Sequence, residues 1–401
     1  METADYLIIG GGIMGITIAR ELKKDHPDAS VLLIEKERDI ALHASGRNSG
    51  VLHAGFYYTA DSLKARFTRE GNRAMRAYCV ERGLKINECG KLVVCQSEAD
   101  MAGLEELLRR GRANGVNLEM IGDKEAREIE PDVITHEAAL WSPDTASVDP
   151  REVTAALADD ARHEGVEIRL GCAYLGRGKQ KGRVRTSLGE MEAGYVVNMA
   201  GLYADKVAAD FGFSRRYRIL PFKGLYLYAG NQAIRPRVHI YPVPDLKHPF
   251  LGVHFTLTVD GRAKIGPTAI PAFWRENYQG FDGFSLTEAT EIMLREARMW
   301  LGNRFGFRHL AFREMQKYRK SFMVDAAQKM YARTRQMEFD KWGPPGIRAQ
   351  LVDIERDKLE MDFVYEGDEN SLHLLNAVSP AFTCSLAISR FLADRINELT
   401  G

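Results

Sequence analysis

The amino-acid sequence predicts an α/β protein in two parts. One part is a discontinuous domain on a parallel sheet, and the other is an α+β part rich in short strands with a helical insertion. Three observations support this prediction: residues 6–35 read strand–helix–strand, residues 216–270 hold short apolar runs between Pro and Gly, and the chain ends in a helical segment. With 401 residues, the chain is long enough for two domains.

The first element pattern is a βαβ unit. Tyr6–Ile9 and Val31–Ile34 are apolar runs typical of buried strands, and a segment with helical periodicity ends near Lys24 between them. The glycines at the first turn allow a tight bend, close approach of a pyrophosphate and close helix–strand packing; they are Gly10, Gly12 and Gly15.

The two residues that directly follow the second strand complete this unit. Glu35 can accept hydrogen bonds from an adenosine ribose, and Lys36 follows it among the expected cofactor-binding residues. The unit therefore predicts a dinucleotide cofactor. The alternative is a glycine-rich turn in another kind of α/β protein.

The loop over residues 44–58 favours FAD over NAD. A nicotinamide enzyme usually continues with another helix–strand repeat, whereas here small and polar residues follow. Ser45, Asn48 and Ser49 can bond a pyrophosphate or a flavin, and Arg47 can offset phosphate charge. A solvated surface loop is the alternative interpretation.

The remaining elements follow from start signals and periodicity. We expect a helix over Asp61–Gly83 and a strand over Lys91–Cys95. A capping box at Ser97 opens a helix that ends near Arg112, and a further helix begins at Asp149 and Pro150. Further expected elements are strands at 166–170 and 196–199, a strand-to-helix turn at 200–205, short strands at 216–270, helices at 286–342, short strands from 343, and a last helix from about 380.

Several blocks in order along the chain resemble the L-2-hydroxyglutarate dehydrogenase/oxidase branch of the D-amino-acid-oxidase-like flavoproteins. The first is Ser-Gly-Arg-Asn-Ser-Gly-Val-Leu-His-Ala-Gly-Phe-Tyr-Tyr at 45–58. The others lie at 221–226, 240–244, 249–256, 260–267, 346–350 and 376–381. The resemblance implies a Rossmann-like FAD-binding domain over 1–90, 148–212 and 343–401, and a substrate-binding domain over 91–147 and 213–342.

The resemblance also implies a reaction, the oxidation of L-2-hydroxyglutarate to 2-oxoglutarate. Hydride would pass to flavin N5 of a non-covalently held FAD, while a base takes the hydroxyl proton. Histidine suits this base because it titrates near neutrality. His53 and His254 lie in the resembling blocks, and the sequence does not decide which is the base and which positions the substrate.

A dicarboxylate substrate needs cations at both ends. Arg348 suits one end because its guanidinium binds a carboxylate through two hydrogen bonds. For the other end and for neutral hydrogen bonds, the expected substrate-binding residues are Tyr57, Lys223, Tyr226, Tyr241, Thr256 and Gln350. A surface charge for Lys223 and core positions for the tyrosines are the alternatives.

The C-terminal part completes the expected cofactor site. The last helix opens at Ser379, Pro380, Ala381 and Thr383, and its free N–H groups would face the flavin edge where negative charge grows on reduction. The resemblance adds Gly201 and Gly346 as cofactor-binding residues. Simple helix capping is the alternative for Ser379 and Thr383, and it is compatible with cofactor binding.

Composition excludes several classes of function. The 55 basic and 55 acidic residues balance, which argues against a dedicated nucleic-acid binder. The five cysteines form no CxxC pair, so no metal site is expected. No apolar run would span a bilayer and no signal peptide is visible, which favours a cytoplasmic location.

The electron acceptor and the membrane remain open at this point. Residues 291–341 carry twelve Arg or Lys against six Asp or Glu. Such a basic amphipathic region suits peripheral contact with an inner membrane and electron transfer to quinone, or a solvated face that attracts substrate, with O₂ as acceptor. The alternative functions are a flavoprotein that oxidises an amino acid, an amine or glycerol-3-phosphate, and a flavin-binding protein without turnover.

Overall fold

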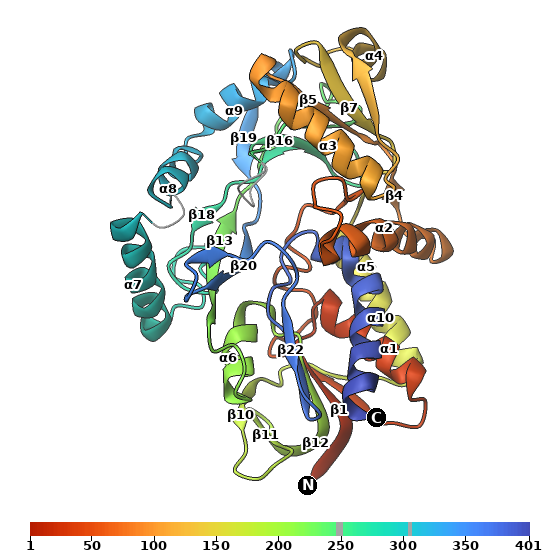
Figure 1. Cartoon of the computed structure of the whole chain (residues 1–401), viewed down its shortest axis with the longest axis vertical. Helices are drawn as coiled ribbons and strands as arrows, with labels where there is room; N and C mark the ends of the chain where they lie inside the picture. Colours follow the sequence, from red (N-terminus) through yellow and green to blue (C-terminus); the bar gives the residue numbers. More distant parts are fainter. Residues whose placement is uncertain (246–251, 304–306) are drawn as a thin grey trace.

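The computed structural model describes residues 1–245, 252–303 and 307–401. The start of one resembling block, Pro249–Leu251, lies outside these residues. Figure 1 shows two parts, with both termini at the same end of the molecule. Among the described residues, no helix has the length and apolar content that crossing a membrane requires.

The N-terminal βαβ unit lies at the centre of the first sheet. Its strand order is β10-β11-β12-β1-β2-β9, and β23 pairs with β12 and β22. β1 is parallel to β2 and β12, as predicted for a Rossmann-like domain. The strands are β1 (Glu2–Ile9), β2 (Val31–Ile34), β9 (Glu167–Arg169), β10 (Tyr174–Arg177), β11 (Arg183–Thr186), β12 (Gly189–Asn198), β22 (Tyr365–Gly367) and β23 (Ser371–Leu374).

Helices cover both faces of this sheet because β1 is apolar on both sides. Ile8 packs into the core with the helices shown beside β1 in Figure 1, while Leu7 and Ile9 face a second core that includes Val207. One of these helices, α5, begins at Pro150, and Asp149 caps it as predicted by accepting from Arg151 N and Glu152 N. The helices are α1 (Ile13–Asp25), α2 (Leu63–Glu81), α5 (Pro150–His163), α6 (Ala204–Asp210) and α10 (Ala381–Thr400).

A second eight-stranded sheet forms the other part, in the order β19-β14-β17-β16-β15-β5-β7-β6. Two separate hydrophobic cores contain residues of this sheet. Met323 of α9 belongs to one of them, and Leu104 and Leu107 of α3 belong to the other, together with Val93 of β5. The strands are β5 (Lys91–Val94), β6 (Glu119–Gly122), β7 (Ala138–Ser142), β14 (Leu227–Ala229), β15 (His239–Pro242), β16 (His254–Leu257), β17 (Ala263–Gly266) and β19 (Phe339–Trp342). The helices are α3 (Met101–Ala113), α4 (Asp123–Ile129) and α9 (Lys320–Gln328).

Two smaller sheets join the parts. One has the order β18-β13-β20-β21 and packs against the outer helices through Phe222 and Ile292; the other has the order β3-β8-β4. The elements are β3 (Val51–Leu52), β4 (Ile86–Asn87), β8 (Ala146–Val148), β13 (Tyr217–Gly224), β18 (Ile270–Pro271), β20 (Gly346–Asp353), β21 (Lys358–Leu359), α7 (Leu286–Gly302) and α8 (Phe307–Gln316).

Two features differ from, or add to, the sequence predictions. The expected helical stretch 286–342 ends in a strand, because β19 pairs with β14 of the second sheet. In addition, β20, which the expected boundary at 343 assigns to the FAD-binding part, pairs along its length with β13 of the substrate-binding part. The domain boundaries themselves stay a prediction.

Candidate functional site

A cavity of about 1150 Å³ lies between the two parts of the molecule. It exceeds the roughly 300–1,000 Å³ typical of a pocket for one small ligand. Most of the predicted site residues line it: Gly10, Gly12, Glu35, Lys36, Ser45, Arg47, Asn48, Ser49, His53, Tyr57, Gly201, Tyr226, Tyr241, His254, Gly346, Arg348, Gln350, Ser379, Pro380, Ala381 and Thr383.

The glycine turn before α1 forms one wall. Gly10 has φ +115°, and a Cβ there would lie 2.6 Å from the carbonyl oxygen of Met199. A Cβ on Gly15 would overlap the carbonyl oxygen of Gly10, so Gly15 acts in packing and does not line the cavity. Gly12 provides no side-chain cap for α1; Ser45 Oγ accepts from Ile13 N at 2.9 Å instead, and Gly12, Ile13 and Met14 of this helix end line the cavity.

Glu35 lies directly beside this turn. Its carboxylate accepts from Gly11 N at 2.7 Å and from Glu37 N at 2.9 Å, which fixes its orientation. The carboxylate is buried and lines the cavity, and each oxygen keeps a lone pair for a further donor. This is the arrangement that ribose recognition requires.

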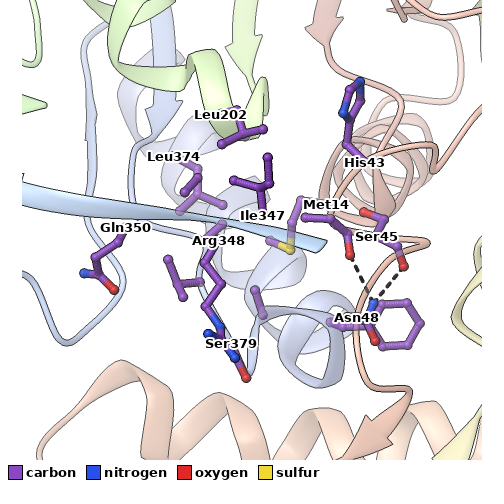
Figure 2. Close-up of a pocket in the computed structure, with 18 of the residues that line it drawn as sticks. Met14, His43, Ser45, Asn48, Leu202, Ile347, Arg348, Gln350, Leu374 and Ser379 are labelled. Carbon is purple, nitrogen blue, oxygen red and sulfur yellow. Dashed lines mark hydrogen bonds between the residues drawn. The ribbon is translucent and has the colours of Figure 1, made fainter. Parts of the chain in front are cut away.

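The loop over 44–58 is stabilised mainly by its own hydrogen bonds. Asn48 donates to the carbonyl oxygens of Ala44 and Ser45 (Figure 2). Ser45 Oγ accepts from Ile13 N at 2.9 Å. Arg47 donates to Leu42 O and to Pro345 O and stacks on Tyr278. Arg47 therefore connects the loop to β20, and its expected role toward phosphate stays a prediction.

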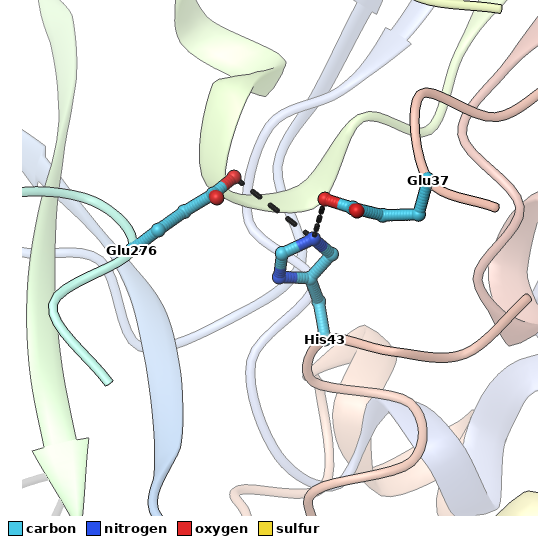
Figure 3. A group of neighbouring side chains, drawn as sticks. All are labelled: Glu37, His43 and Glu276. Carbon is cyan, nitrogen blue, oxygen red and sulfur yellow. Dashed lines mark hydrogen bonds and ion pairs between the residues drawn. The ribbon is translucent and has the colours of Figure 1, made fainter. Parts of the chain in front are cut away.

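A charged cluster borders the cavity near Lys36. His43 Nε2 lies 3.0 Å from Glu37 and 3.9 Å from Glu276, as Figure 3 shows. The Lys36 ammonium pairs with both carboxylates and lies 2.8 Å from Glu276. Because Glu276 belongs to the second part of the chain, this cluster connects the two parts beside the cavity.

His53 and His254 are both buried in the cavity wall, and Nδ1 of each has no hydrogen-bond partner in the part of the chain that the structure describes. Burial lowers the pKa of both imidazoles well below the ordinary value, and neighbouring cationic groups add to the effect. His254 stacks on Tyr241 with ring centroids 3.7 Å apart. Both imidazoles line the cavity, and a neutral imidazole can accept a proton from a bound ligand.

Arg348 extends from β20 into the same cavity (Figure 2). Its Nη1 donates to Thr268 O at 3.2 Å, and burial lowers its pKa. Tyr226 interacts electrostatically with Arg348, and burial raises the pKa of its phenol to about 12. The buried hydroxyl of Tyr57 has no partner. A guanidinium, two imidazoles and three phenols thus surround one space.

The N-terminus of α10 forms a further wall. Thr383 Oγ1 accepts from His53 N at 3.2 Å and bonds Val51 O at 3.3 Å, so it couples the helix to the histidine loop. The first residues of α10, Ala381, Phe382 and Thr383, line the cavity, and this helix end has no side-chain cap from Pro380.

Two predicted substrate ligands lie elsewhere, and a third is already bonded. Lys223 donates to Asn277 at 3.2 Å and is outside the cavity lining. Thr256 is fully buried within β16 and also outside the lining. Gln350 reaches the cavity, but its amide nitrogen donates to Glu360 O at 2.7 Å.

The sequence prediction missed several polar residues of the wall, among them Tyr58, Lys64 and Arg110. Lys64 lies on the buried stripe of α2 with Phe67 and Gly71. A lysine in an apolar helical stripe was the available signal, because lysine is seldom fully buried without a role.

Comparison with known proteins places the chain among flavoproteins. The family model FAD dependent oxidoreductase matches residues 5–395. The chain is 38% identical over 403 residues to L-2-hydroxyglutarate dehydrogenase of Escherichia coli (strain K12), covering 98% of this chain and 93% of that protein. It is 34% identical over 418 residues to the mitochondrial L-2-hydroxyglutarate dehydrogenase of Homo sapiens, covering 98% and 89%.

Solved structures show the same fold. Reduced L-α-glycerophosphate oxidase of Mycoplasma pneumoniae with FAD bound superposes with a TM-score of 0.76 at 23% identity, covering 99% of this chain and 95% of that chain. Glycine oxidase of Geobacillus kaustophilus gives 0.73 at 19% identity, with 99% and 95% covered.

Proposed function

The chain belongs to the L-2-hydroxyglutarate dehydrogenase family of FAD-dependent oxidoreductases, and we propose that it oxidises L-2-hydroxyglutarate to 2-oxoglutarate. One observation carries the proposal. A single cavity contains both the glycine turn with Glu35 and the group formed by His53, His254 and Arg348. A dinucleotide and a small anionic substrate would therefore share one enclosed space.

The residues present fit FAD. Gly10 and Gly12 leave backbone exposed at the N-terminus of α1, where a pyrophosphate is favoured, and Glu35 is held in place to accept from a ribose. The N-terminus of α10 offers partial positive charge at another wall. When bound, FAD accepts the hydride that the substrate carbon loses.

The side chains supply the acid–base and positioning chemistry. Arg348 binds the carboxylate next to the hydroxyl through its planar guanidinium. His53 or His254 takes the hydroxyl proton, since burial keeps both imidazoles neutral. Lys36 and His43 from one part and Glu276 from the other part line the cavity together, and their contacts hold the two parts in place around it.

The competing substrates within the fold are an amine and glycerol-3-phosphate. A neutral amine needs no separate base, so the paired buried histidines favour an alcohol. A protein without turnover would not need a guanidinium and two unpartnered imidazole atoms in its cavity, since such groups cost stability when buried.

Anaerobic mixing tests the proposal directly. L-2-hydroxyglutarate should bleach the flavin of the purified holoenzyme rapidly, whereas the D-enantiomer, glycine and glycerol-3-phosphate should leave the flavin oxidised. A holoenzyme that is reduced by glycerol-3-phosphate or glycine, and stays oxidised with L-2-hydroxyglutarate, would contradict the proposed substrate.

We also propose peripheral membrane contact, with a membrane quinone as electron acceptor. The support is a cluster of exposed apolar side chains on α7 and α8, including Leu294 (57% exposed), Leu301 (74%) and Phe312 (64%). Exposed Arg298, Arg308 and Arg319 lie on the same segment. An apolar surface with basic residues suits an anionic bilayer.

Sedimentation with vesicles tests this contact. The holoenzyme should pellet with vesicles of anionic phospholipid more than with neutral ones, and Leu301→Glu should weaken the binding. Leu188→Glu is the matched control, because Leu188 is 63% exposed in a different part of the chain. Equal sedimentation of Leu301→Glu and the wild type would contradict the proposed surface, and faster reoxidation by O₂ than by a quinone analogue would contradict the acceptor.

A further inference from the structure

Among the residues that the structure describes, six Lys and Arg side chains line the cavity, and they differ in what they already bind. Lys36 pairs with Glu276, Lys206 with Glu288, and Arg110 with Glu106. Arg47 donates to the carbonyl oxygens of Leu42 and Pro345. The two that remain are Arg348, which donates to a backbone carbonyl, and Lys64.

Lys64 is only 6% exposed, yet its ammonium has no ion pair or hydrogen bond within the described ranges. The ammonium lies 5.8 Å from the ring centre of Tyr58 and 6.0 Å from that of Phe363. Burial lowers the pKa of Lys64 to about 8. A cation removed from water in this way gains strongly from an anionic partner.

The carboxylate of Asp362 attracts Lys64 and partly opposes the effect of burial on its pKa, but the two form no ion pair within the described ranges. Asp362 accepts from Leu63 N at 2.8 Å and from Lys64 N at 2.9 Å, and also from Phe363 N. Its charge therefore stabilises the N-terminus of α2. The ammonium of Lys64 is left at the cavity wall, available to a ligand.

The position of Lys64 suits the far end of a substrate held at Arg348. Arg348 and His254 are electrostatic neighbours, and His254 stacks on Tyr241. The phenol of Tyr241 interacts in turn with that of Tyr58, over which Lys64 lies. Lys64 and Arg348 thus line the same cavity, and a series of interacting side chains, His254, Tyr241 and Tyr58, connects them.

We propose that Lys64 binds the distal carboxylate of a 2-hydroxy dicarboxylate while Arg348 binds the carboxylate beside the hydroxyl. This inference rests on the proposed function and replaces Lys223, whose ammonium bonds Asn277 outside the cavity lining. Lys64 then selects dicarboxylates, because a methyl group at this end would leave its charge unpaired.

The first test compares two substrates of equal chain length. In anaerobic single-turnover reduction, Lys64→Met should lower the apparent second-order rate constant of flavin reduction by L-2-hydroxyglutarate by about 10- to 150-fold, the loss expected for one charge-assisted contact. L-2-hydroxyvalerate, which lacks the distal carboxylate, should change little. Lys64→Arg should recover part of the preference, and Lys85→Met, an exposed lysine paired with Asp260, is the matched control.

The second test measures binding without turnover. Glutarate should perturb the flavin spectrum of the oxidised holoenzyme at lower concentration than butyrate, and Lys64→Met should remove that difference while retaining full FAD content. Unchanged selectivity in Lys64→Met, or loss of selectivity in Lys223→Met instead, overturns the inference. If L-2-hydroxyglutarate fails to reduce the wild type, the proposed function fails, and equal glutarate affinity of wild type and Lys64→Met then overturns the role of Lys64 as well.

Discussion

Arg348 combines a buried charge with a fixed orientation, since its Nη1 donates to Thr268 O. Arg348→Lys should slow flavin reduction by any 2-hydroxy acid by about 10²-fold, because a lysine supplies a point charge in place of a planar two-point contact and lets the reacting carbon shift. Single-turnover reduction measures the effect, with the exposed Arg109→Lys as control. A near-normal rate in Arg348→Lys would remove Arg348 from the site.

The two histidines can be separated by substitution. The His53→Gln or His254→Gln variant that removes the base should lose about 10²–10⁴-fold in reduction rate. Because burial lowers both pKa values, the wild-type rate should hold to pH below 6.5 and fall only at more acidic pH. That acidic limb should vanish in the variant lacking the base. An unchanged limb in both variants would favour an amine substrate.

The residues of the site were predictable to different degrees. His53 and Arg348 lie in blocks that resemble a known family, so their place could be expected. Lys223 and Lys64 look equally plausible in sequence. Their difference arises only on folding, when Asn277 reaches Lys223 while Tyr58 and Phe363 enclose Lys64. Contacts between segments that are far apart in the chain leave no pattern in the sequence around either lysine, so they could not be predicted from it.

At the scale of helices and strands, sequence patterns predicted the elements that depend on interactions between residues close together in the chain. The βαβ unit and the cap at Asp149 follow from periodicity and capping, which act within a few residues. β19 was missed because its strand state depends on pairing with β14, far earlier in the chain. β-propensity of this kind depends on tertiary context.

In the βαβ unit, Glu35 at the end of the second strand should contribute strongly to FAD binding through the ribose. Glu35→Ala should weaken FAD retention more than it slows the enzyme that still holds FAD, because Glu35 lies at the glycine turn with its carboxylate bonded to Gly11 N. A charge-assisted hydrogen bond is worth about 1.5–3 kcal/mol. Flavin released on dilution and ultrafiltration measures retention, with the exposed Glu81→Ala as control. Full occupancy in Glu35→Ala would contradict ribose binding by Glu35.

At the scale of the whole molecule, the cavity belongs to neither part alone. β13 and β20 pair across the expected domain boundary, and Lys36 pairs with Glu276 across the cavity end. Sequence patterns predicted the two parts but not this junction, since it forms from segments that meet only in the folded chain. A ligand in the cavity would therefore stabilise both parts together.

Four buried histidines predict how the stability of the whole molecule depends on pH. Burial lowers the pKa of His53 and His254, and it lowers that of His239 and His373 to about 3. Below pH 6.5 the unfolded chain binds protons at these residues while the folded chain does not. The free energy of unfolding should therefore fall as pH decreases through this range, by about 1.4 kcal/mol per histidine and pH unit.

Buried carboxyl groups oppose this trend. Burial raises the pKa of Glu296 to about 8, so the folded chain holds a proton there that the unfolded chain has lost above pH 4.5, and burial also raises the pKa of Glu130. Four histidines against these two carboxyl groups still leave a net loss of stability on acidification. The holoenzyme saturated with FAD should unfold at lower temperature at pH 5.5 than at pH 7.5. His373→Gln should reduce this pH dependence, whereas the exposed His163→Gln should not. A melting temperature that is constant or higher at pH 5.5 would mean that the buried histidines bind protons in the folded state.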